Sequence, residues 1–425
     1  MNYRILGIIT AIAVMAVVAF YYQPPADMQA EIDVAVAHNT ILDTASSVTV
    51  GDIPESVTRA NNAFAIDFYK EVAVEGKSIF FSPLGAFTAF SLLYEGAQHE
   101  TAEQLESVFR IERDDILRAS DVVKVVMATS KDFDSSIYMA SAIWPADWFN
   151  PYDSYISVAQ DVYNAKMESV SYTNEQGILR INEWASDNTN GRIDKVLDSD
   201  DVDDDTVMVL SSVVHFEGIW ESEFSREATE EAAFWDGTAE ITVDFMKTQD
   251  TFEYMSDYSV QVIKLPYDGD ELSMLIILPH GRDGIADLEE RISTGAIERW
   301  RSELRPEVVS VTMPKISIKN EYDLIPPLRT LGVTNVFDRS SSDLAGMGHT
   351  GSERLYVSKA THNTYLDVNE AGTEAGATTT IVTTIKSAIA EPTQRFVADH
   401  PFMILIQDDN SGMIFFMGRI TDPTS

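Results

Sequence analysis

The chain has 425 residues, of which 45% are hydrophobic, enough to bury one large soluble core or two ordinary ones. Its 68 acidic residues outnumber its 30 lysines and arginines, so the formal net charge is -38. This excess excludes a broad basic surface for nucleic acid and argues against anionic polymers as partners. Cysteine is absent, so disulfides and thiolate metal sites are excluded and packing must supply the stability.

The N-terminus has the pattern of an export segment, in which Arg4 precedes an apolar run at 5–20 and acidic residues follow. By the positive-inside rule, the bulk of the chain is expected outside the cytoplasm, with the N-terminal segment as its one link to a membrane. Residues 1–22 are interpreted as a signal anchor, because no small-residue cleavage site directly follows the run; a cleaved signal peptide is the alternative. Residues 23–56 lack a sustained period and predict a flexible tether, which leaves 57–425 as the folded domain.

Three helices are predicted in the first part of the domain, at 58–72, 84–94 and 101–108. Ser82 and Pro83 form a strong start for the second helix, with a polar cap followed by proline in the first turn. For the third helix, the pattern predicts Thr101 as the cap and Gln104 as its capping-box partner.

Strands are predicted at 207–216, 260–265, 272–278, 308–313, 402–407 and 413–417. They are interspersed with helices without a strict βαβ alternation, which favours an α+β fold over a doubly wound parallel sheet.

Motifs for catalysis, metals and cofactors are not found. The sequence has no GxSxG elbow, HExxH, P-loop or dinucleotide fingerprint, and its histidines are scattered. The acid-dense stretch 198–205 lacks the glycine and glutamate of an EF-hand, so a solvated loop is predicted there rather than a metal site. We expect neither an enzyme nor a bound cofactor.

Near the C-terminus, residues 378–385 are all β-branched and favour a pleated surface, while the small residues at 372–377 can bend and thread through a narrow gap. With a two-residue period, one face of this segment is suited to burial: Thr373, Ala375, Ala377, Thr379, Ile381, Thr383 and Ile385. The other face, which includes Glu374 and Thr378, tolerates water. An ordinary sheet strand is the simpler alternative.

The segment 368–375, which reads VNEAGTEA, resembles the hinge of the reactive-centre loop in the serpin family, and FVADHPF at 396–402 resembles the strand after that loop. Other serpin-like segments follow one another in order, at 62–69, 79–83, 96–104, 182–193, 216–224, 265–267, 273–279, 322–332 and 415–423. Each match is short, but their order makes the chain similar to serpins over about 57–423.

The resemblance implies one α+β unit with three β-sheets, about nine helices and an exposed reactive-centre loop. It also implies a suicide inhibitor: a serine protease attacks the loop, forms an acyl-enzyme, and is trapped when the loop inserts into the main sheet. Such a protein is expected to be a monomer that is at risk of polymerisation. The implied hinge consists of Glu370, Gly372, Thr373, Glu374, Ala375, Gly376, Ala377 and Thr378. Its inward positions carry neither charge nor proline, which favours insertion.

Counting from Gly372 as the fifteenth residue before the scissile bond places cleavage between Lys386 and Ser387. Lys386 predicts a trypsin-like target, because such proteases carry a carboxylate at the base of their primary pocket. Cleavage after Ile385 or Thr384 by a protease of another preference stays open. A lysine that serves only solubility is a further alternative, as is a non-inhibitory serpin that acts as an extracellular binding or chaperone module.

Residues that control opening of the sheet are also implied by the resemblance. Trp220 matches the tryptophan at the top of the sheet, and His362 matches the histidine beneath its central strands, next to the helix start at Ser82. Where many serpins have asparagine and serine, this chain has Ser212 and Gly85. Both changes are expected to thin the hydrogen-bond cluster around His362 and to ease sheet opening, latency or polymerisation.

Overall fold

The computed structural model describes residues 53–110, 135–269, 271–349, 353–373 and 391–424. These residues form an α+β fold with eight α-helices and three β-sheets, which confirms the predicted fold class. The predicted anchor at 1–22 and most of the predicted tether lie outside the described residues. In the described part of the chain, no helix is long and apolar enough to cross a membrane.

The main sheet has six strands in the order β11-β13-β14-β5-β2-β4. They are β11 (Ile316–Asp323), β13 (Lys359–Asn369), β14 (Gly372–Thr373), β5 (Met208–Ile219), β2 (Ser135–Pro145) and β4 (Lys166–Met167). At the centre, β13 and β5 pair in parallel from Lys359 opposite Val209 to Tyr365 opposite His215. These two strands are far apart in the sequence, so the centre of the sheet joins two distant parts of the chain.

A second sheet has nine strands in the order β1-β17-β16-β9-β8-β7-β10-β15, with β6 added beside β7. Its strands are β1 (Ile79–Phe81), β6 (Glu230–Trp235), β7 (Glu240–Ser256), β8 (Val260–Pro266), β9 (Leu272–Pro279), β10 (Arg305–Pro314), β15 (Gln394–Val397), β16 (Phe402–Asp408) and β17 (Ile414–Ile420). A third, two-stranded sheet pairs β12 (Gly348–His349) with β3 (Asn150–Pro151). All six strands predicted from the sequence lie within or overlap the observed strands.

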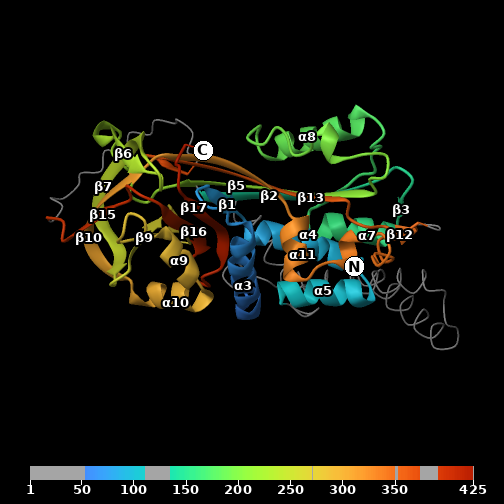
Figure 1. Cartoon of the computed structure of the whole chain (residues 1–425), viewed down its shortest axis with the longest axis horizontal. Coiled ribbons are helices and arrows are strands. Elements are labelled where there is room, and N and C mark those ends of the chain that lie inside the picture. The colour runs from blue at the N-terminus through green and yellow to red at the C-terminus, as the bar shows by residue number, and fades with distance from the viewer. Residues whose placement is uncertain (1–52, 111–134, 270, 350–352, 374–390, 425) are drawn as a thin grey trace, which may run out of the picture.

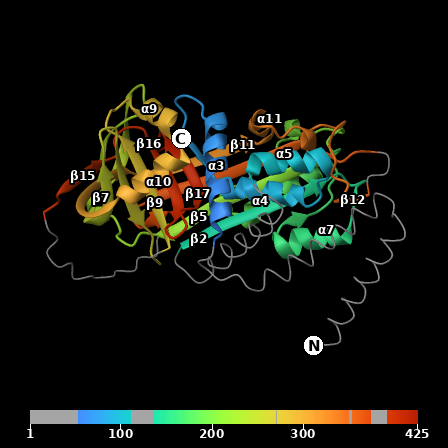
Figure 2. The same cartoon turned by 90° about the horizontal axis from the view of Figure 1, so that it is seen from below.

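The described residues contain eight α-helices, and several of them cover the two faces of the main sheet. The eight helices are α3 (Glu55–Val72), α4 (Pro83–Tyr94), α5 (His99–Phe109), α7 (Asp153–Ser157), α8 (Glu175–Asn188), α9 (Ile285–Arg291), α10 (Thr294–Glu303) and α11 (Ile325–Leu331). Figure 1 shows α8 on one face of the main sheet and α4, α5 and α11 on the other. The view in Figure 2 shows α3, α4 and α5 side by side across that second face. The central strands are therefore buried on both sides.

Two of the three predicted helix starts can be tested at their caps. Helix α4 begins as predicted: the Oγ of Ser82 accepts a hydrogen bond from the N–H of Gly85 at 3.0 Å, and Pro83 is in the first turn. The predicted capping box of α5 is wrong, because the helix begins two residues before Thr101. Thr101 instead accepts a hydrogen bond from the N–H of Asp343, and Gln104 accepts one from Thr334. Both side chains that the local pattern assigned to a cap thus bond instead to residues that are distant in the sequence.

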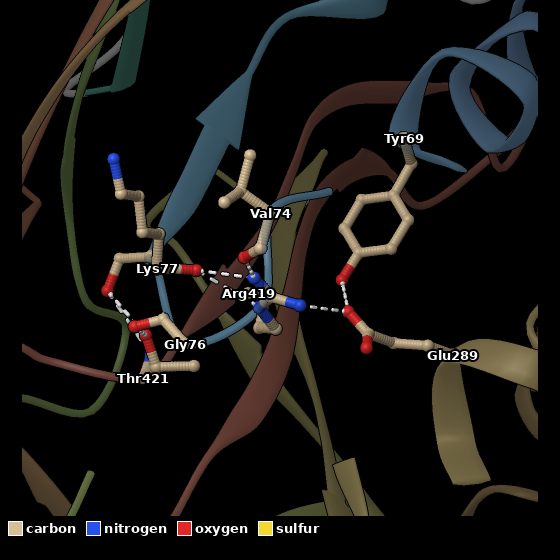
Figure 3. Close-up of polar contacts among 8 residues, drawn as sticks. Tyr69, Val74, Gly76, Lys77, Glu289, Arg419 and Thr421 are labelled. Atoms are coloured by element: carbon tan, nitrogen blue, oxygen red, sulfur yellow. Dashed lines mark hydrogen bonds and ion pairs between the residues drawn. The ribbon is translucent and has the colours of Figure 1, made fainter. Parts of the chain in front are cut away.

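The chain segment between α3 and β1 is fastened to the end of the domain by Arg419 of β17 (Figure 3). The buried guanidinium donates to the backbone oxygens of Val74 and Lys77 and pairs with Glu289, which also accepts a hydrogen bond from Tyr69. The charge is therefore buried with its donors satisfied, as burial of a cation requires. This contact joins α3, α9 and β17 at one point.

The acid-dense stretch contains a short 3-10 turn, Ser199–Asp201, in which the side chain of Asp201 accepts a hydrogen bond from the N–H of Asp198. Asp201 also forms an ion pair with Lys359, at the start of β13, at 2.9 Å. Within the described residues, no group of three or more potential ligands is placed to hold a metal ion.

Candidate functional site

The first residues of the predicted hinge already lie inside the main sheet. After β13 ends at Asn369, the chain turns back and the two residues of β14 run between β13 and β5. Thr373 is opposite Val368 on one side and Gly218 on the other, while Gly372 is opposite Asn369 and Ile219. Both partner strands are antiparallel to β14, so the hinge starts a new strand at one end of the parallel β13–β5 pair.

Gly372 fits this position because it lacks a side chain. Its φ of +156° lies in a region that other residues rarely adopt, and a Cβ would come within 1.9 Å of the backbone oxygen of Gly218. A larger residue would push β14 away from β5. The glycine that the sequence predicted as part of the hinge is therefore the residue that permits close approach of the two backbones.

Trp220 and Tyr267 hold the start of β14. Their rings stack at 4.4 Å, and the Nε1 of Trp220 donates a hydrogen bond to the backbone oxygen of Asn369 at 3.0 Å. The hydroxyl groups of Tyr267 and Thr373 are 2.7 Å apart, and both residues are fully buried. Burial raises the pKa of Tyr267 far above its usual value, so this hydroxyl keeps its proton and its hydrogen bond.

Glu370 fixes the turn between β13 and β14. It is 8% exposed, and its carboxylate accepts hydrogen bonds from Thr229 at 2.7 Å and from Lys315 at 2.9 Å. Its backbone oxygen accepts a third, from the N–H of Phe224 at 2.8 Å. Burial alone would raise the pKa of Glu370, but the bonds from Thr229 and Lys315 bring it below its usual value. The carboxylate is therefore ionised and tied to neighbours outside the hinge.

A ring of hydrogen bonds joins β13, β5 and the start of α4 beneath the centre of the sheet. The N–H of Ser82 donates to Nε2 of His362 at 3.0 Å, so the ring proton sits on Nδ1, which lies 3.2 Å from the Oγ of Ser212. Ser212 donates to the backbone oxygen of Gly85 at 3.3 Å, and the N–H of Gly85 donates to Ser82 at 3.0 Å. Each of the four residues therefore forms a hydrogen bond with the next one in the ring.

Gly85 and Ser212 take part in this ring. A Cβ on residue 85 would lie 2.5 Å from a methyl group of Val214 and 3.1 Å from the ring of His362, so a side chain there would displace one of them. His362 is fully buried, and burial lowers its pKa to about 3. The neutral form is thus the one that the site holds, as its acceptor role at Nε2 requires.

Comparison with known proteins decides the family. Residues 59–423 match the family model described as Serpin (serine protease inhibitor). The chain is 30% identical to an uncharacterized serpin-like protein of Methanosarcina acetivorans, with 86% of each chain covered, and 31% identical to human antithrombin-III, with 87% of this chain and 84% of the other covered. The solved structure of uncleaved ovalbumin is similar with a TM-score of 0.77 and 26% identity, over 87% of this chain and all of that one.

The chain belongs to the serpin family. Serpins are generally protease inhibitors rather than enzymes, and many members of the family inhibit proteases. The family also includes non-inhibitory members, among them ovalbumin. Membership therefore establishes the fold, whereas the residues of this serpin must distinguish between the inhibitory and the non-inhibitory group.

The structure brings together the predicted residues Glu370, Gly372, Thr373 and Trp220 at one end of the β13–β5 pair, and Ser82, Ser212 and His362 beneath its centre. The other predicted residues lie outside the described residues: Glu374, Ala375, Gly376, Ala377, Thr378, Lys386 and Ser387. No role was predicted from the sequence for Tyr267, Lys315 or Thr229. Tyr267 lies within the serpin-like segment 265–267 and could have been found there, whereas no pattern marks the other two.

Proposed function

We propose that this serpin inhibits a serine endopeptidase by a suicide-substrate mechanism in which the cleaved loop inserts between β13 and β5. The observation that carries the proposal is the position of β14, whose two residues pair with both strands. Insertion would extend a strand that already exists, so the unfavourable first step of strand nucleation is complete before the protease arrives. The small inward residues at 375 and 377 allow the extension to continue.

The protease supplies the groups that react with the loop. Its serine hydroxyl attacks the carbonyl carbon of Lys386, the peptide bond to Ser387 breaks, and the new amino group leaves with a proton supplied by the protease histidine. An ester then joins the protease to Lys386. If the loop inserts faster than water attacks this ester, the protease is carried along the sheet and held as a covalent complex.

The proposed target is trypsin-like. Lys386 is the single cation in the sequence between Gly372 and Arg395. A protease with a carboxylate at the base of its primary pocket would pair with this lysine and would leave that carboxylate unpaired if an apolar residue entered. Lys386 therefore fits the role of the residue that the protease recognises.

Mixing the purified full-length protein with trypsin tests this proposal. We expect a complex that survives boiling in detergent, with mass spectrometry placing the cut after Lys386. A matched variant, Lys386→Ala, should form far less complex with trypsin and keep the fold. A second variant, Thr373→Arg, places a charge against Tyr267 in the buried end of the sheet and should convert the inhibitor into a substrate. Cleavage of the wild type by trypsin without any adduct would refute inhibition of a trypsin-like protease.

A non-inhibitory binding or chaperone module is the second candidate, supported by the similarity to ovalbumin. The two candidates differ in what loop cleavage does to stability. A strand that inserts into the sheet raises the denaturation temperature strongly, whereas a loop that stays outside leaves it almost unchanged. Thermal unfolding of the intact and the cleaved protein separates them.

We also propose that the protein lies outside the cytoplasm, either secreted or tethered to the membrane by residues 1–22. Support comes from Arg4 before the apolar run and the acidic residues after it. Fractionation of producing cells, with and without protease treatment of the intact surface, tests this placement.

A further inference from the structure

Several buried polar side chains in the main sheet have no hydrogen-bond partner among the described residues, and three of them lie close together on β5 and β13. These three are Ser211 on β5 and Thr361 and Asn363 on β13, and each is at most 1% exposed. Both the oxygen and the nitrogen of the Asn363 amide are unpaired. Buried polar groups are almost always hydrogen-bonded, so a cluster of three exceptions calls for an explanation.

These three residues share one face of the sheet. Ser211 and Thr361 are direct partners in the parallel pairing of β5 and β13, and Asn363 follows two residues later opposite Val213. Val213 belongs to the hydrophobic cluster that packs against α8, so this is the face that α8 covers (Figure 1). The alternate residues on both strands, such as Ser212 and His362, point to the opposite face, where they form the hydrogen-bonded ring.

The position of β14 fixes where an inserted loop would lie. Thr373 is opposite Gly218 on β5 and Val368 on β13, and both pairings are antiparallel. Each further loop residue therefore pairs with the residue one place earlier on both strands. Carried on without a shift, this register places Thr378 between Val213 and Asn363, and Thr380 between Ser211 and Thr361. Both threonines fall on the face that α8 covers.

We infer that Ser211, Thr361 and Asn363 form a receiving row for Thr378 and Thr380 of the inserted loop. The inference rests on the proposed function and adds the specific side chains that recognise the loop. Thr380 has one hydroxyl, which can donate to one neighbouring hydroxyl and accept from the other. Thr378 can bond to the amide of Asn363 in the same way. Insertion thus gives three buried groups the partners that they lack in the native sheet.

Between this row and the hinge, the same register places Gly376 between Tyr365 and His215. His215 is fully buried and stacks on Tyr138 at 4.4 Å, so aromatic rings already occupy this face. A residue without a side chain can pass between the two rings, whereas a larger one would have to displace them. The loop sequence thus fits the sheet at three consecutive outward positions, with glycine beside aromatic rings and threonines beside polar groups.

The receiving row predicts opposite effects of one substitution in two states of the protein. Thr361→Val removes an unpaired buried hydroxyl from the intact protein, so its denaturation temperature should rise by about 1 to 3 °C. In the loop-cleaved protein, the same substitution removes a partner of Thr380, so the denaturation temperature should fall by a similar amount. Both temperatures are measured in a fixed concentration of guanidinium chloride that brings the cleaved form into range.

Two matched controls accompany this test. Thr364 lies on the same strand as Thr361 but faces the opposite side, where its hydroxyl donates to the backbone oxygen of Phe80 at 2.6 Å. Thr364→Val should therefore lower the denaturation temperature of both the intact and the cleaved form. In the loop, Thr380→Val should lower the denaturation temperature of the cleaved form only. Thr384→Val should do little, because the register places Thr384 between Val207 and Val357.

The outcomes separate this inference from the proposed function. If cleavage leaves the wild-type denaturation temperature unchanged, the loop does not insert and both proposals fall. If cleavage stabilises the wild type but Thr361→Val shifts both forms in the same direction, the receiving row alone is overturned. A third comparison adds Thr380→Val to the wild type and to the double variant Ser211→Ala, Thr361→Val. If it destabilises the cleaved form of the first but not of the second, the side chains of Ser211, Thr361 and Thr380 act as one interface.

Discussion

His362 and Ser212 join the two strands that must separate for the loop to insert, because their Nδ1 and Oγ atoms lie 3.2 Å apart and the residues are direct partners in the pairing of β13 and β5. The contact is one of four in the ring that includes Ser82 and Gly85. Sheet opening has to break this contact between the strands. The strength of this ring is therefore part of the barrier that keeps the native form from inserting its own loop.

Ser212→Ala tests the ring. The substitution leaves the Nδ1–H of His362 without its acceptor and the oxygen of Gly85 without its donor, at a cost of about 1 to 3 kcal/mol. We expect a lower denaturation temperature for the intact protein and faster conversion to latent or polymeric forms on warming, followed by native gel electrophoresis. Ser141→Ala is the matched control, since it removes an unpaired buried hydroxyl on β2, directly opposite Ser212 and outside the β13–β5 pair. Equal conversion rates for Ser212→Ala and the wild type would contradict a role for the ring.

The stability of the intact protein should fall as the pH is lowered from about 6.5 towards 4. Burial lowers the pKa of His362 to about 3, and burial together with the charge of Arg192 lowers that of His215 to about 4, from an unfolded value of 6.5. Because the unfolded chain binds protons more readily, each histidine contributes stability that is complete above pH 6.5 and is lost by about 1.4 kcal/mol per pH unit below it.

Urea denaturation at several pH values between 7 and 4.5 measures this loss. His362→Gln should give a shallower decline than the wild type, because one of the two buried histidines no longer titrates. His99→Gln serves as the control, since the His99 side chain is 84% exposed. A decline as steep in His362→Gln as in the wild type would show that His362 does not contribute to the pH dependence.

Lys315→Met should loosen the hinge. It leaves the buried carboxylate of Glu370 with Thr229 as its remaining side-chain partner. Because the Lys315 side chain is 37% exposed, solvent screens part of the attraction, and we expect a loss of about 1 kcal/mol. Thermal unfolding and the rate of polymer formation measure the effect. Lys319→Met is the control, since Lys319 pairs with the exposed Asp194; a similar change in both variants would assign the effect to lost surface charge.

The sequence predicted the features that depend on neighbouring residues. Ser82 and Pro83 start α4 because a cap and a proline in the first turn act within one turn of helix. The predicted strands are observed because each is a short run rich in β-branched and apolar residues, which is a local signal. The hinge could be recognised as a family pattern, and the structure adds that Gly372 is required by the close approach of Gly218.

The features that the sequence did not predict depend on contacts between distant segments. Nothing near Thr101 shows that its hydroxyl accepts from Asp343, so the local pattern assigned it to a cap. From the sequence, Gly85 was expected to weaken the hydrogen-bond cluster. In the structure its small size makes room for His362, and its backbone oxygen accepts a hydrogen bond from Ser212 within the ring. The unpaired side chains of the receiving row can be recognised only when the burial of β5 and β13 is known.

Glu374 should slow insertion, because the register of β14 places it between Asp367 and Glu217 on the face that holds the receiving row. Like charges on directly opposite residues destabilise a sheet, whereas a favourable opposite-charge pair contributes about 0.2 to 1 kcal/mol. Glu374→Gln should therefore form more covalent complex per cleaved molecule and give a more stable cleaved form. The gain should shrink as salt is added, because exposed charges are screened over about 10 Å at 0.1 M. Glu391→Gln, at an exposed carboxylate beyond the loop, should show no gain, and a gain in both variants would trace the effect to the net charge of -38 instead of the register.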